Sequence, residues 1–359
     1  MKRLSVVIKC FNEAQKIDEA IRSALAARSE LGAMDLEVVV ADGLSTDETT
    51  TRALQWAQAN PVRVVQLLHE EDRTCGAGVE LGFVSSTGDV VFFMDGDMVL
   101  QSGFLKQAMR YLDQHPRCAG VAGVVTEALV FNATDRIRMR QGLNRSLGAQ
   151  PWLNGGGLYR REALLSAEGV AGDRRLAAFE EADLGLRLER AGWTLHRLRE
   201  VSVLHRGHAL PAWKVLGSRW RAGRFEAAGR LLKLHGAKKN GWRVWRLLAH
   251  PILLTAAWSM LLALALNARA SASLKPVLWM SASFCALAIA HLLIKRDVRH
   301  VLTAWMDWHL MMLGMLWGVV HPMPERGAGV SHRVLADGVR DPAAGESRNR
   351  PFAQVRQPT

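Results

Sequence analysis

Short apolar runs of strand length alternate with helical stretches through the first 125 residues, and this alternation limits the possible folds more than any other feature. Helical periodicity fills the intervals: Ile17, Ile21 and Leu25 share one face, and Asn12 precedes them as a candidate cap. Strands that alternate with helices form parallel sheets with right-handed crossovers, covered by helices on both faces. We therefore expect an α/β domain with a mostly parallel sheet. Its first four strands should lie at residues 4–9, 36–41, 62–67 and 90–94.

Two acidic turns directly follow two of these strands. Asp42 comes at the end of the second run, and Asp95 and Asp97 follow the fourth. In open parallel sheets, ligands bind beyond the carboxyl ends of the strands. We predict that Asp42 accepts hydrogen bonds from a nucleobase or ribose, and that Asp95 and Asp97 hold a divalent cation, Mn²⁺ or Mg²⁺, with positions left for phosphate oxygens. A capped or solvated acidic turn is the simpler interpretation of either motif alone.

A third acidic stretch, at residues 179–187, contains Glu180, Glu181 and Asp183. Glu181 and Asp183 are two residues apart, so they cannot share a helix face. We expect one acid to face the site and the other to hold the local structure by pairing with Arg187 at i+4. A sugar hydroxyl that attacks an anomeric carbon needs a base beside it, and a carboxylate at this helix start is a candidate. The alternative is an ordinary solvated acidic helix turn.

These motifs, in this order, resemble those of the large family 2 of nucleotide-sugar glycosyltransferases, which has the GT-A fold. The resemblance covers about residues 3–210. The stretch 5–13 is similar to the family's first strand and its "x-x-N-E" turn, which implies that Asn12 and Glu13 belong to the donor site. Asp42 matches the family's nucleoside-binding acid. Asp95 and Asp97 match its D-x-D motif, in which the second Asp usually contacts metal.

Further segments extend the resemblance. The glycine-rich segment 154–161 implies that Gly156 lies near donor sugar and acceptor, and Arg73 stands where the family often contacts diphosphate. Residues 180–184 resemble the family's "E-D-x-D-L" segment, whose second acid is the catalytic base. That comparison selects Glu181, with Glu180 as the alternative. His205 resembles a third metal ligand of some GT-A enzymes, and a surface or core histidine is the competing interpretation.

Several functions remain open at this point. The resemblance implies inverting transfer, for which we expect a UDP-sugar donor and a lipid-linked or other saccharide acceptor, as in exopolysaccharide or glycolipid assembly. Residues 216–220 are similar to the Q-x-x-R-W signature of processive polysaccharide synthases, but Leu216 replaces the glutamine, so we expect addition of single sugars. The alternatives are a processive synthase, transfer onto polyprenyl phosphate, and a scaffold without catalysis.

The net charge of +12 is concentrated before the apolar part of the chain. Residues 212–248 contain ten Lys or Arg and one acid, interleaved with Trp213, Trp220, Trp242 and Trp245. Such a basic amphipathic segment is typical of an interfacial collar that binds anionic membrane lipid. Because it adjoins apolar runs, we favour membrane lipid as its partner and expect no nucleic acid.

Three apolar runs follow, at about residues 251–266, 276–294 and 301–320. They predict two or three transmembrane helices, and the third run contains Asp307 and His309, which are costly in lipid. We expect four parts: a catalytic domain (1–210), the basic interfacial segment (211–249), the transmembrane helices (250–320) and a disordered tail (321–359). Unpaired cysteine spacing and the lack of a signal-peptide pattern favour a catalytic domain on the cytoplasmic side of the inner (plasma) membrane.

Overall fold

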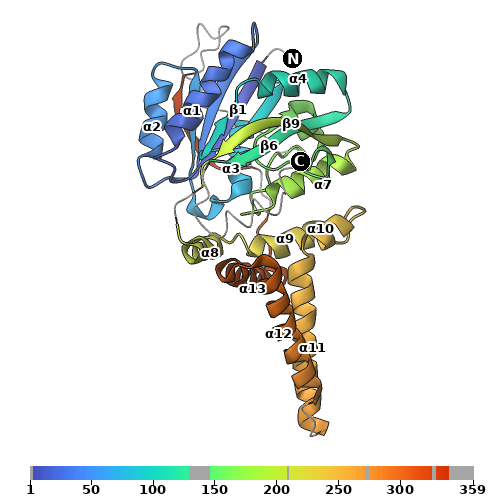
Figure 1. The fold of residues 1–359 in the computed structure, drawn as a ribbon. Coiled ribbons are helices and arrows are strands. Elements are labelled where there is room, and N and C mark those ends of the chain that lie inside the picture. The colour runs from blue at the N-terminus through green and yellow to red at the C-terminus, as the bar shows by residue number, and fades with distance from the viewer. Residues whose placement is uncertain (1–2, 129–145, 208–209, 272–274, 326–328, 339–359) are drawn as a thin grey trace, which may run out of the picture.

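The computed structural model describes residues 3–128, 146–207, 210–271, 275–325 and 329–338. A sheet with helices on both faces forms the upper part of the molecule in Figure 1. A layer of helices lies beneath it, and two long helices project downward from that layer as a hairpin (Figure 1).

One ten-stranded sheet, in the order β10-β3-β2-β1-β4-β8-β6-β9-β5, with β7 paired to β9, organises the upper part. The first four strands occur where the sequence predicts them, and β1–β2, β1–β4 and β2–β3 pair in parallel. Beyond β4 the sheet is mixed, because β8 runs antiparallel to both β4 and β6 while β6 and β9 are parallel. The strands are β1 (Arg3–Cys10), β2 (Asp35–Asp42), β3 (Val62–Leu67), β4 (Val90–Asp95), β5 (Met98–Leu100), β6 (Cys118–Glu127), β7 (Gly148–Gln150), β8 (Gly157–Arg160), β9 (Thr194–His205) and β10 (His332–Asp337).

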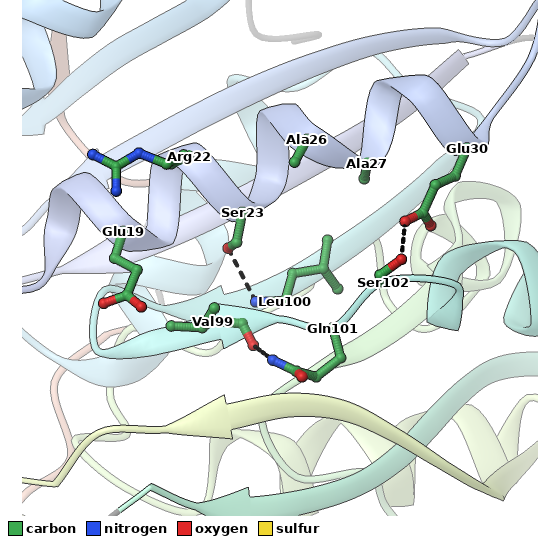
Figure 2. Close-up of a pocket in the computed structure, with 10 residues that line it drawn as sticks. All are labelled: Glu19, Arg22, Ser23, Ala26, Ala27, Glu30, Val99, Leu100, Gln101 and Ser102. Atoms are coloured by element: carbon green, nitrogen blue, oxygen red, sulfur yellow. Dashed lines mark hydrogen bonds between the residues drawn. The ribbon is translucent and has the colours of Figure 1, made fainter.

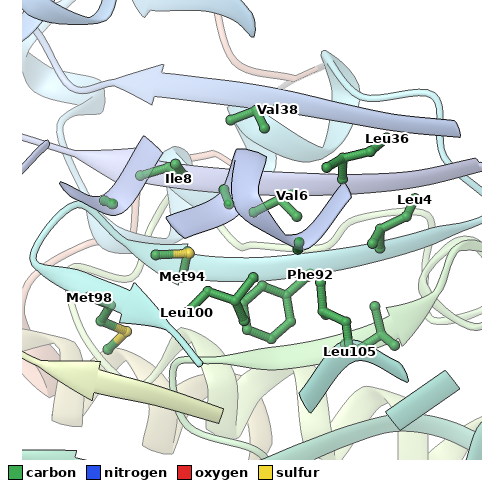
Figure 3. Packing of buried hydrophobic residues seen from close by; sticks show 14 of the residues in the cluster. Leu4, Val6, Ile8, Leu36, Val38, Phe92, Met94, Met98, Leu100 and Leu105 are labelled. Carbon is green, nitrogen blue, oxygen red and sulfur yellow. The ribbon is translucent and has the colours of Figure 1, made fainter. Parts of the chain in front are cut away.

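Each face of the sheet packs against its own helices. On one face, Val6 and Phe92 of the sheet pack with Leu105 of α4 (Figure 3). Ile21 of α1 belongs to the same cluster. On the other, α3, α6 and the inner side of α7 cover the alternate strand residues. The helices are α1 (Ile17–Ala26), α2 (Thr49–Ala57), α3 (Cys75–Val84), α4 (Phe104–Gln114), α6 (Arg161–Ser166), α7 (Glu180–Arg190), α8 (Ala212–Arg221), α9 (Glu226–His235), α10 (Trp242–Leu247), α11 (Ala249–Ser271), α12 (Lys275–Lys295) and α13 (Val298–Val320), with 3₁₀ turns η1 (Ala27–Glu30) and η2 (Glu70–Asp72).

The helix α7 is buried on two sides, which connects the sheet to the layer beneath. Leu184 and Leu188 pack toward the sheet. Ala182 and Leu186 pack with Leu231 of α9 in a separate cluster. The helix that begins with Glu180 and Glu181 is therefore fixed by both the sheet and the layer below it.

The basic segment forms three helices, and its middle helix is packed rather than interfacial. α9 contacts α13 at glycines: a Cβ on Gly229 would lie 2.1 Å from the Met315 carbonyl oxygen, and one on Gly318 would lie 2.2 Å from the Glu226 carbonyl oxygen. Two helices approach this closely only where small residues face each other. The four tryptophans of α8 and α10 stay 46–64% exposed, so these shorter helices present the amphipathic surface.

Two of the three predicted apolar runs have the character of membrane spans. In α11 and α12, the stretches Ala249–Asn267 and Val277–Lys295 are long and apolar enough to cross a membrane, and 6% and 0% of them is buried. The third run forms α13, which does not meet that measure and lies along α9. Its Asp307 forms an ion pair of 3.5 Å with Arg219 of α8, so the acid that seemed costly in lipid has a cationic partner.

Two predictions were wrong. Part of the tail predicted to be disordered is ordered: His332–Asp337 forms β10, which pairs antiparallel with β3 at the sheet edge. Residues 339–359 lie outside the described part of the chain. An edge strand accepts any chain that matches its hydrogen-bonding groups, and composition does not reveal such pairing. Asn12 does not cap α1, which begins at Ile17; it adopts a positive φ of 56° and bonds to the Thr46 turn instead.

Candidate active site

Charged side chains from three distant stretches line one small cavity of about 30 Å³. Lys9 lies near the end of β1, Asp95 ends β4, and Glu180 and Glu181 begin α7. Gly155 of the glycine-rich segment lines the same cavity. Parallel pairing of β1 and β4 sets Lys9 opposite Asp95, so the sheet register brings these groups together. Two of the three predicted acidic motifs thus meet at one site.

Lys9 connects the two motifs. Its Nζ lies 2.6 Å from Glu180 Oε1 and 3.3 Å from Asp95 Oδ1. Burial disfavours the ammonium, but the carboxylates of Asp95 and Glu180 outweigh burial and hold the pKa of Lys9 well above its usual value. The cation therefore stays charged and compensates two buried acids.

The two neighbouring glutamates differ in their proton affinity. Burial opposes ionisation of Glu180, but the charge and the hydrogen bond of Lys9 lower the pKa of Glu180 below its usual value. Burial, and then the negative charge of Glu180, raise the pKa of Glu181 to about 8. A general base acts best when its pKa lies near the working pH. Glu181 has that property, and Glu180 serves as the ion-pair partner of Lys9.

The second acid of the D-x-D motif lies in a separate polar cluster. His205 Nε2 is 3.3 Å from Asp97 Oδ2, and His205 Nδ1 is 2.6 Å from Glu127 Oε2. The strand register explains the meeting, since His205 pairs with Met98 of β5 and with Glu127 of β6. Burial alone would lower the pKa of His205, but its hydrogen bonds to Asp97 and Glu127 raise it to about 10. Lys16 lies 3.1 Å from Glu13 Oε2 and 3.9 Å from Asp97 Oδ2.

The donor set suits a hard divalent cation. Asp97 supplies carboxylate oxygen and His205 an imidazole nitrogen, while Glu127 orients the imidazole from behind, an arrangement common to metal-bound histidines. Within the described residues, however, no three such side chains already converge as a ligand cage, and the Asp95 carboxylate pairs with Lys9. A cation bound there would replace the proton on His205, since a ligating imidazole must be neutral.

Asp42 occupies the interior of its own turn. It is fully buried, and its two oxygens accept hydrogen bonds from Ser45, Thr50 and Gln66, including 2.5 Å from Ser45 Oγ and 2.6 Å from Gln66 Nε2. A nucleoside would contact this carboxylate only if Ser45 moved. In the structure, Asp42 therefore fixes the turn rather than presenting itself to a ligand.

The other predicted donor-site residues border this turn and the D-x-D motif. Asn12 Oδ1 accepts the Thr46 backbone N–H at 2.8 Å. Arg73 lies over the Phe11 ring, 4.5 Å from its centroid, and borders Gly43. Gly156 has a φ of +83° and donates its N–H to the Phe93 carbonyl, which brings the glycine segment beside β4.

A broad groove of about 860 Å³ runs along the outer side of Asn12, Glu13 and Thr46. A second groove, of about 340 Å³, lies between α1 and β5 and is shown in Figure 2. There the Leu100 N–H donates to Ser23 Oγ and Ser102 bonds to Glu30, so its polar groups fasten β5 to α1 (Figure 2). Only the first groove adjoins the predicted donor residues.

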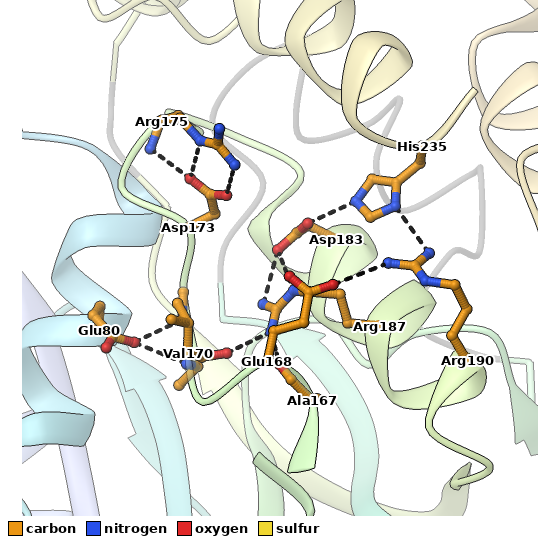
Figure 4. A network of polar contacts seen from close by, with 12 residues as sticks. Glu80, Ala167, Glu168, Val170, Asp173, Arg175, Asp183, Arg187, Arg190 and His235 are labelled. Carbon is orange, nitrogen blue, oxygen red and sulfur yellow. Dashed lines mark hydrogen bonds and ion pairs between the residues drawn. The ribbon is translucent and has the colours of Figure 1, made fainter. Parts of the chain in front are cut away.

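A buried polar network supports α7 from below (Figure 4). Asp183 Oδ2 accepts hydrogen bonds from Arg187 at 3.0 and 2.8 Å, which confirms the predicted i+4 pairing. Asp183 Oδ1 lies 2.7 Å from His235 Nε2 of α9, and His235 Nδ1 lies 3.0 Å from Arg190. The network joins α7 to α9, so the helix that carries Glu181 is fixed relative to the layer beneath.

Sequence reasoning missed the cations of the site. Lys9 is a lone charged residue inside an apolar strand, and that exception was the signal that could have identified it. Lys16 and Glu127 carry no such signal. Arg224, assigned to the lipid-binding collar, is close enough to Cys75, Glu180 and Asp95 for these groups to raise the pKa of its guanidinium. Because burial raises the pKa of Cys75 to about 11, the two carboxylates supply this effect at neutral pH.

Comparison with known proteins identifies the family. Residues 5–164 match the profile described as glycosyl transferase family 2. Residues 5–164 therefore form a domain of glycosyl transferase family 2. An uncharacterized glycosyltransferase from Nostoc sp. is 26% identical to it over 134 residues, 37% of this chain, and the match spans only 39% of that relative's length.

Two solved structures are similar to this chain, and one of them shows its fold. A mannosyltransferase from Pyrobaculum calidifontis, in complex with GDP-Man and Mn²⁺, matches with a TM-score of 0.60 over 89% of this chain and 87% of the other, at 20% identity. TarS from S. aureus, in complex with UDP-GlcNAc, matches with a TM-score of 0.47 over 65% of this chain and 67% of the other, at 17% identity. The first likeness shows that the chain has the GT-A fold.

Proposed function

We propose that this protein transfers a sugar, with inversion, from a nucleotide-sugar donor, for which we expect a UDP-sugar, to a hydroxyl of a lipid-linked saccharide. One observation carries the proposal: Asp95, Glu180 and Glu181 line a single cavity beside the Asp97–His205 pair. A structural protein gains little from so many buried acids, because each must be compensated. A site that binds a metal ion together with a diphosphate, and that accepts a proton from a hydroxyl, needs such acids.

In this proposal, Glu181 is the general base. Its carboxylate takes the proton of the acceptor hydroxyl while that oxygen bonds to the anomeric carbon. The bond from the anomeric carbon to the diphosphate breaks on the opposite face, and the nucleoside diphosphate leaves with the electron pair. Lys9 keeps Glu180 ionised beside it, and the raised pKa of Glu181 makes it the stronger base of the two.

Asp97, Asp95 and His205 would hold the divalent cation. When bound, such a cation neutralises negative charge on the leaving diphosphate. Lys16 lies beside Asp97 and Lys9 lies beside Asp95, so each carboxylate has a cationic neighbour before metal binds. Binding of metal and donor would then exchange one set of positive charges for another at little electrostatic cost.

Two features support an acceptor attached to a membrane lipid. Exposed tryptophans and basic residues on α8 and α10 suit the headgroup layer, and α11 and α12 are candidate membrane spans. Arg224, between α8 and α9, lies near the cavity acids and could bind the phosphate of such an acceptor. The lipid-bound end would then approach from the helix layer.

The strand β10 supports two crossings rather than three. It follows α13 in the chain and pairs with β3 of the catalytic sheet. A chain that leaves a domain, crosses a membrane and returns to the same sheet must cross an even number of times. We therefore propose that α11 and α12 span the inner membrane, that α13 lies along its surface, and that the catalytic domain is cytoplasmic.

A donor screen tests the proposal. Full-length protein in detergent would be incubated with UDP-, GDP- and dTDP-sugars, with Mn²⁺ or with chelator, and release of nucleoside diphosphate would be measured. We expect Mn²⁺-dependent release from one donor class, increased by lipid-linked saccharide. Absence of nucleoside diphosphate release with every donor, with and without lipid-linked saccharide, would contradict the proposed function.

A further inference from the structure

We infer that Arg333, on the strand β10, is a positioning residue for the nucleoside end of the donor. It would act through Gln66 and Asp42 on the turn that follows β2. The inference rests on the proposed nucleotide-sugar function and adds to it a residue from beyond the apolar helices. None of the sequence motifs that resemble family 2 includes this segment.

A row of paired residues crosses four strands of the sheet at this point. Cys10 of β1 pairs with Asp42 of β2, and Asp42 pairs with Gln66 of β3. Gln66 in turn pairs with Arg333 of β10. The row ends at the turn after β1, which contains Asn12. A side chain on the edge strand is therefore in register with the two turns that border the predicted donor site.

Hydrogen bonds connect Arg333 to Asp42 through Gln66. Arg333 donates from Nε at 3.1 Å and from Nη2 at 2.5 Å to Gln66 Oε1. Gln66 Nε2 donates to Asp42 Oδ2 at 2.6 Å. The Gln66 side chain is 6% exposed, so its amide has little access to water.

The chemistry of arginine determines how the Gln66 amide is oriented. A guanidinium has only donors, so it requires the amide oxygen, and this leaves the amide NH₂ directed at Asp42. A carboxylate has only acceptors, so it requires that NH₂. Arg333 thus holds Gln66 in the single orientation that satisfies Asp42. Without Arg333, the buried amide oxygen of Gln66 loses a charge-assisted hydrogen bond. The Gln66 amide is then no longer held in the orientation that donates to Asp42.

Asp42 passes this constraint to the turn. Its Oδ1 accepts the Ser45 hydroxyl at 2.5 Å, and Ser45 Oγ in turn accepts the Asn12 backbone N–H at 2.9 Å. Thr50 also donates to Asp42 Oδ2, at 2.9 Å. Displacing Asp42 would therefore move both turns, whereas the D-x-D motif lies on the other side of β1.

The strand itself is held by other contacts. Asp337 forms two hydrogen bonds of 3.2 Å with Arg63, and Leu68 donates its N–H to the Ser331 carbonyl at 3.0 Å. Arg63 also donates to the Ser85 carbonyl at 2.6 Å. Asp337→Asn therefore weakens a side-chain contact of the same strand without touching Gln66, and it is the matched control for Arg333→Met.

The experiment measures ligand binding by calorimetry, with full-length protein in detergent and Mn²⁺ present. The probes are UDP, GDP and dTDP, of which the tightest wild-type ligand is used, and inorganic pyrophosphate, which lacks the nucleoside. We expect Arg333→Met to weaken nucleoside diphosphate binding about 5- to 10-fold, the usual worth of one such hydrogen bond, and to leave pyrophosphate binding unchanged. Arg333→Lys, which restores a donor, should recover most of the affinity, and Asp337→Asn should match wild type.

Each other outcome has a definite meaning. Wild-type affinity for the nucleoside diphosphate in Arg333→Met overturns the inference. An equal loss for pyrophosphate also overturns it, because that pattern indicates general damage to the fold. Asp42→Asn distinguishes failure of the proposed function from failure of the inference about Arg333. If Asp42→Asn weakens nucleoside diphosphate binding while Arg333→Met does not, only the inference fails. If no nucleoside diphosphate binds the wild-type protein, the proposed function fails and the inference falls with it.

Discussion

The variant Asp183→Asn tests how strongly the buried network beneath α7 stabilises this protein. The side chains of Asp183 and Arg187 are each 2% exposed, and Asp183 also bonds to His235. Burial opposes ionisation, yet Arg187 and the His235 hydrogen bond lower the pKa of Asp183 from 3.8 to about 2. That difference corresponds to about 2 kcal/mol of folding free energy at neutral pH. Leaving the buried Arg187 without its anion adds to the loss, for a total of roughly 2–4 kcal/mol.

Thermal unfolding, followed by tryptophan fluorescence at one fixed scan rate in detergent, would measure the effect. We expect Asp183→Asn to lower the Tm by roughly 4–16 °C, given about 2–4 °C per kcal/mol for a domain of this size. The pH dependence has a defined sign. Since the folded pKa lies below the unfolded value, the contribution is fully present above about pH 4 and is lost as the pH falls toward 2. The Tm gap between wild type and variant should stay constant from about pH 8 to 5 and narrow below pH 4.

Glu168→Gln is the matched control, because Glu168 borders the same network but is half-exposed. Its Oε1 lies 3.7 Å from Arg190 Nη2, and its side chain is 46% exposed. An exposed pair at that distance contributes at most about 1 kcal/mol, so the control should shift the Tm by less than about 4 °C. Equal shifts for Asp183→Asn and Glu168→Gln would refute the reasoning, since burial would then make no difference.

Further predictions concern the site and the membrane helices. Glu181→Gln should reduce turnover about 10²–10⁴-fold with little change in donor affinity, measured by steady-state kinetics and calorimetry; an active Glu181→Gln with an inactive Glu180→Gln would assign the base to Glu180. Asp97→Ala should abolish Mn²⁺-dependent donor binding while the protein still folds, and full activity of that variant in chelator would exclude the metal role. Lys9→Met should destabilise the fold by about 3 kcal/mol because it leaves Glu180 buried without its cation; the double variant Lys9→Met/Glu180→Gln should unfold at a higher temperature than Lys9→Met, and no recovery would contradict the ion-pair assignment. Full-length protein should remain with membranes through a high-salt wash, since insertion of α11 and α12 does not depend on counterions, whereas release by salt would show that these helices do not insert.

The sequence by itself determined the local elements and the candidate acids. Strands that are mostly buried, such as β1, are mostly apolar in sequence, so their position follows from the local sequence. The acids of the D-x-D motif and of α7 were identifiable because they lie where strands end or a helix begins. Even the Asp183–Arg187 pair was predictable, since i+4 spacing on a helix brings two side chains together.

Only the tertiary structure decided which distant residues meet. Lys9 acquires its role through the β1–β4 register and the packing of α7, and His205 reaches Asp97 through the pairing of β9 with β5 and β6. The burial of Asp42 and the addition of β10 to the sheet edge are likewise long-range events. Local sequence records propensity and periodicity, but strand register and helix docking depend on contacts between residues as far apart as Gln66 and Arg333. Those contacts exist only once the chain is folded, and they determine the electrostatics of the site.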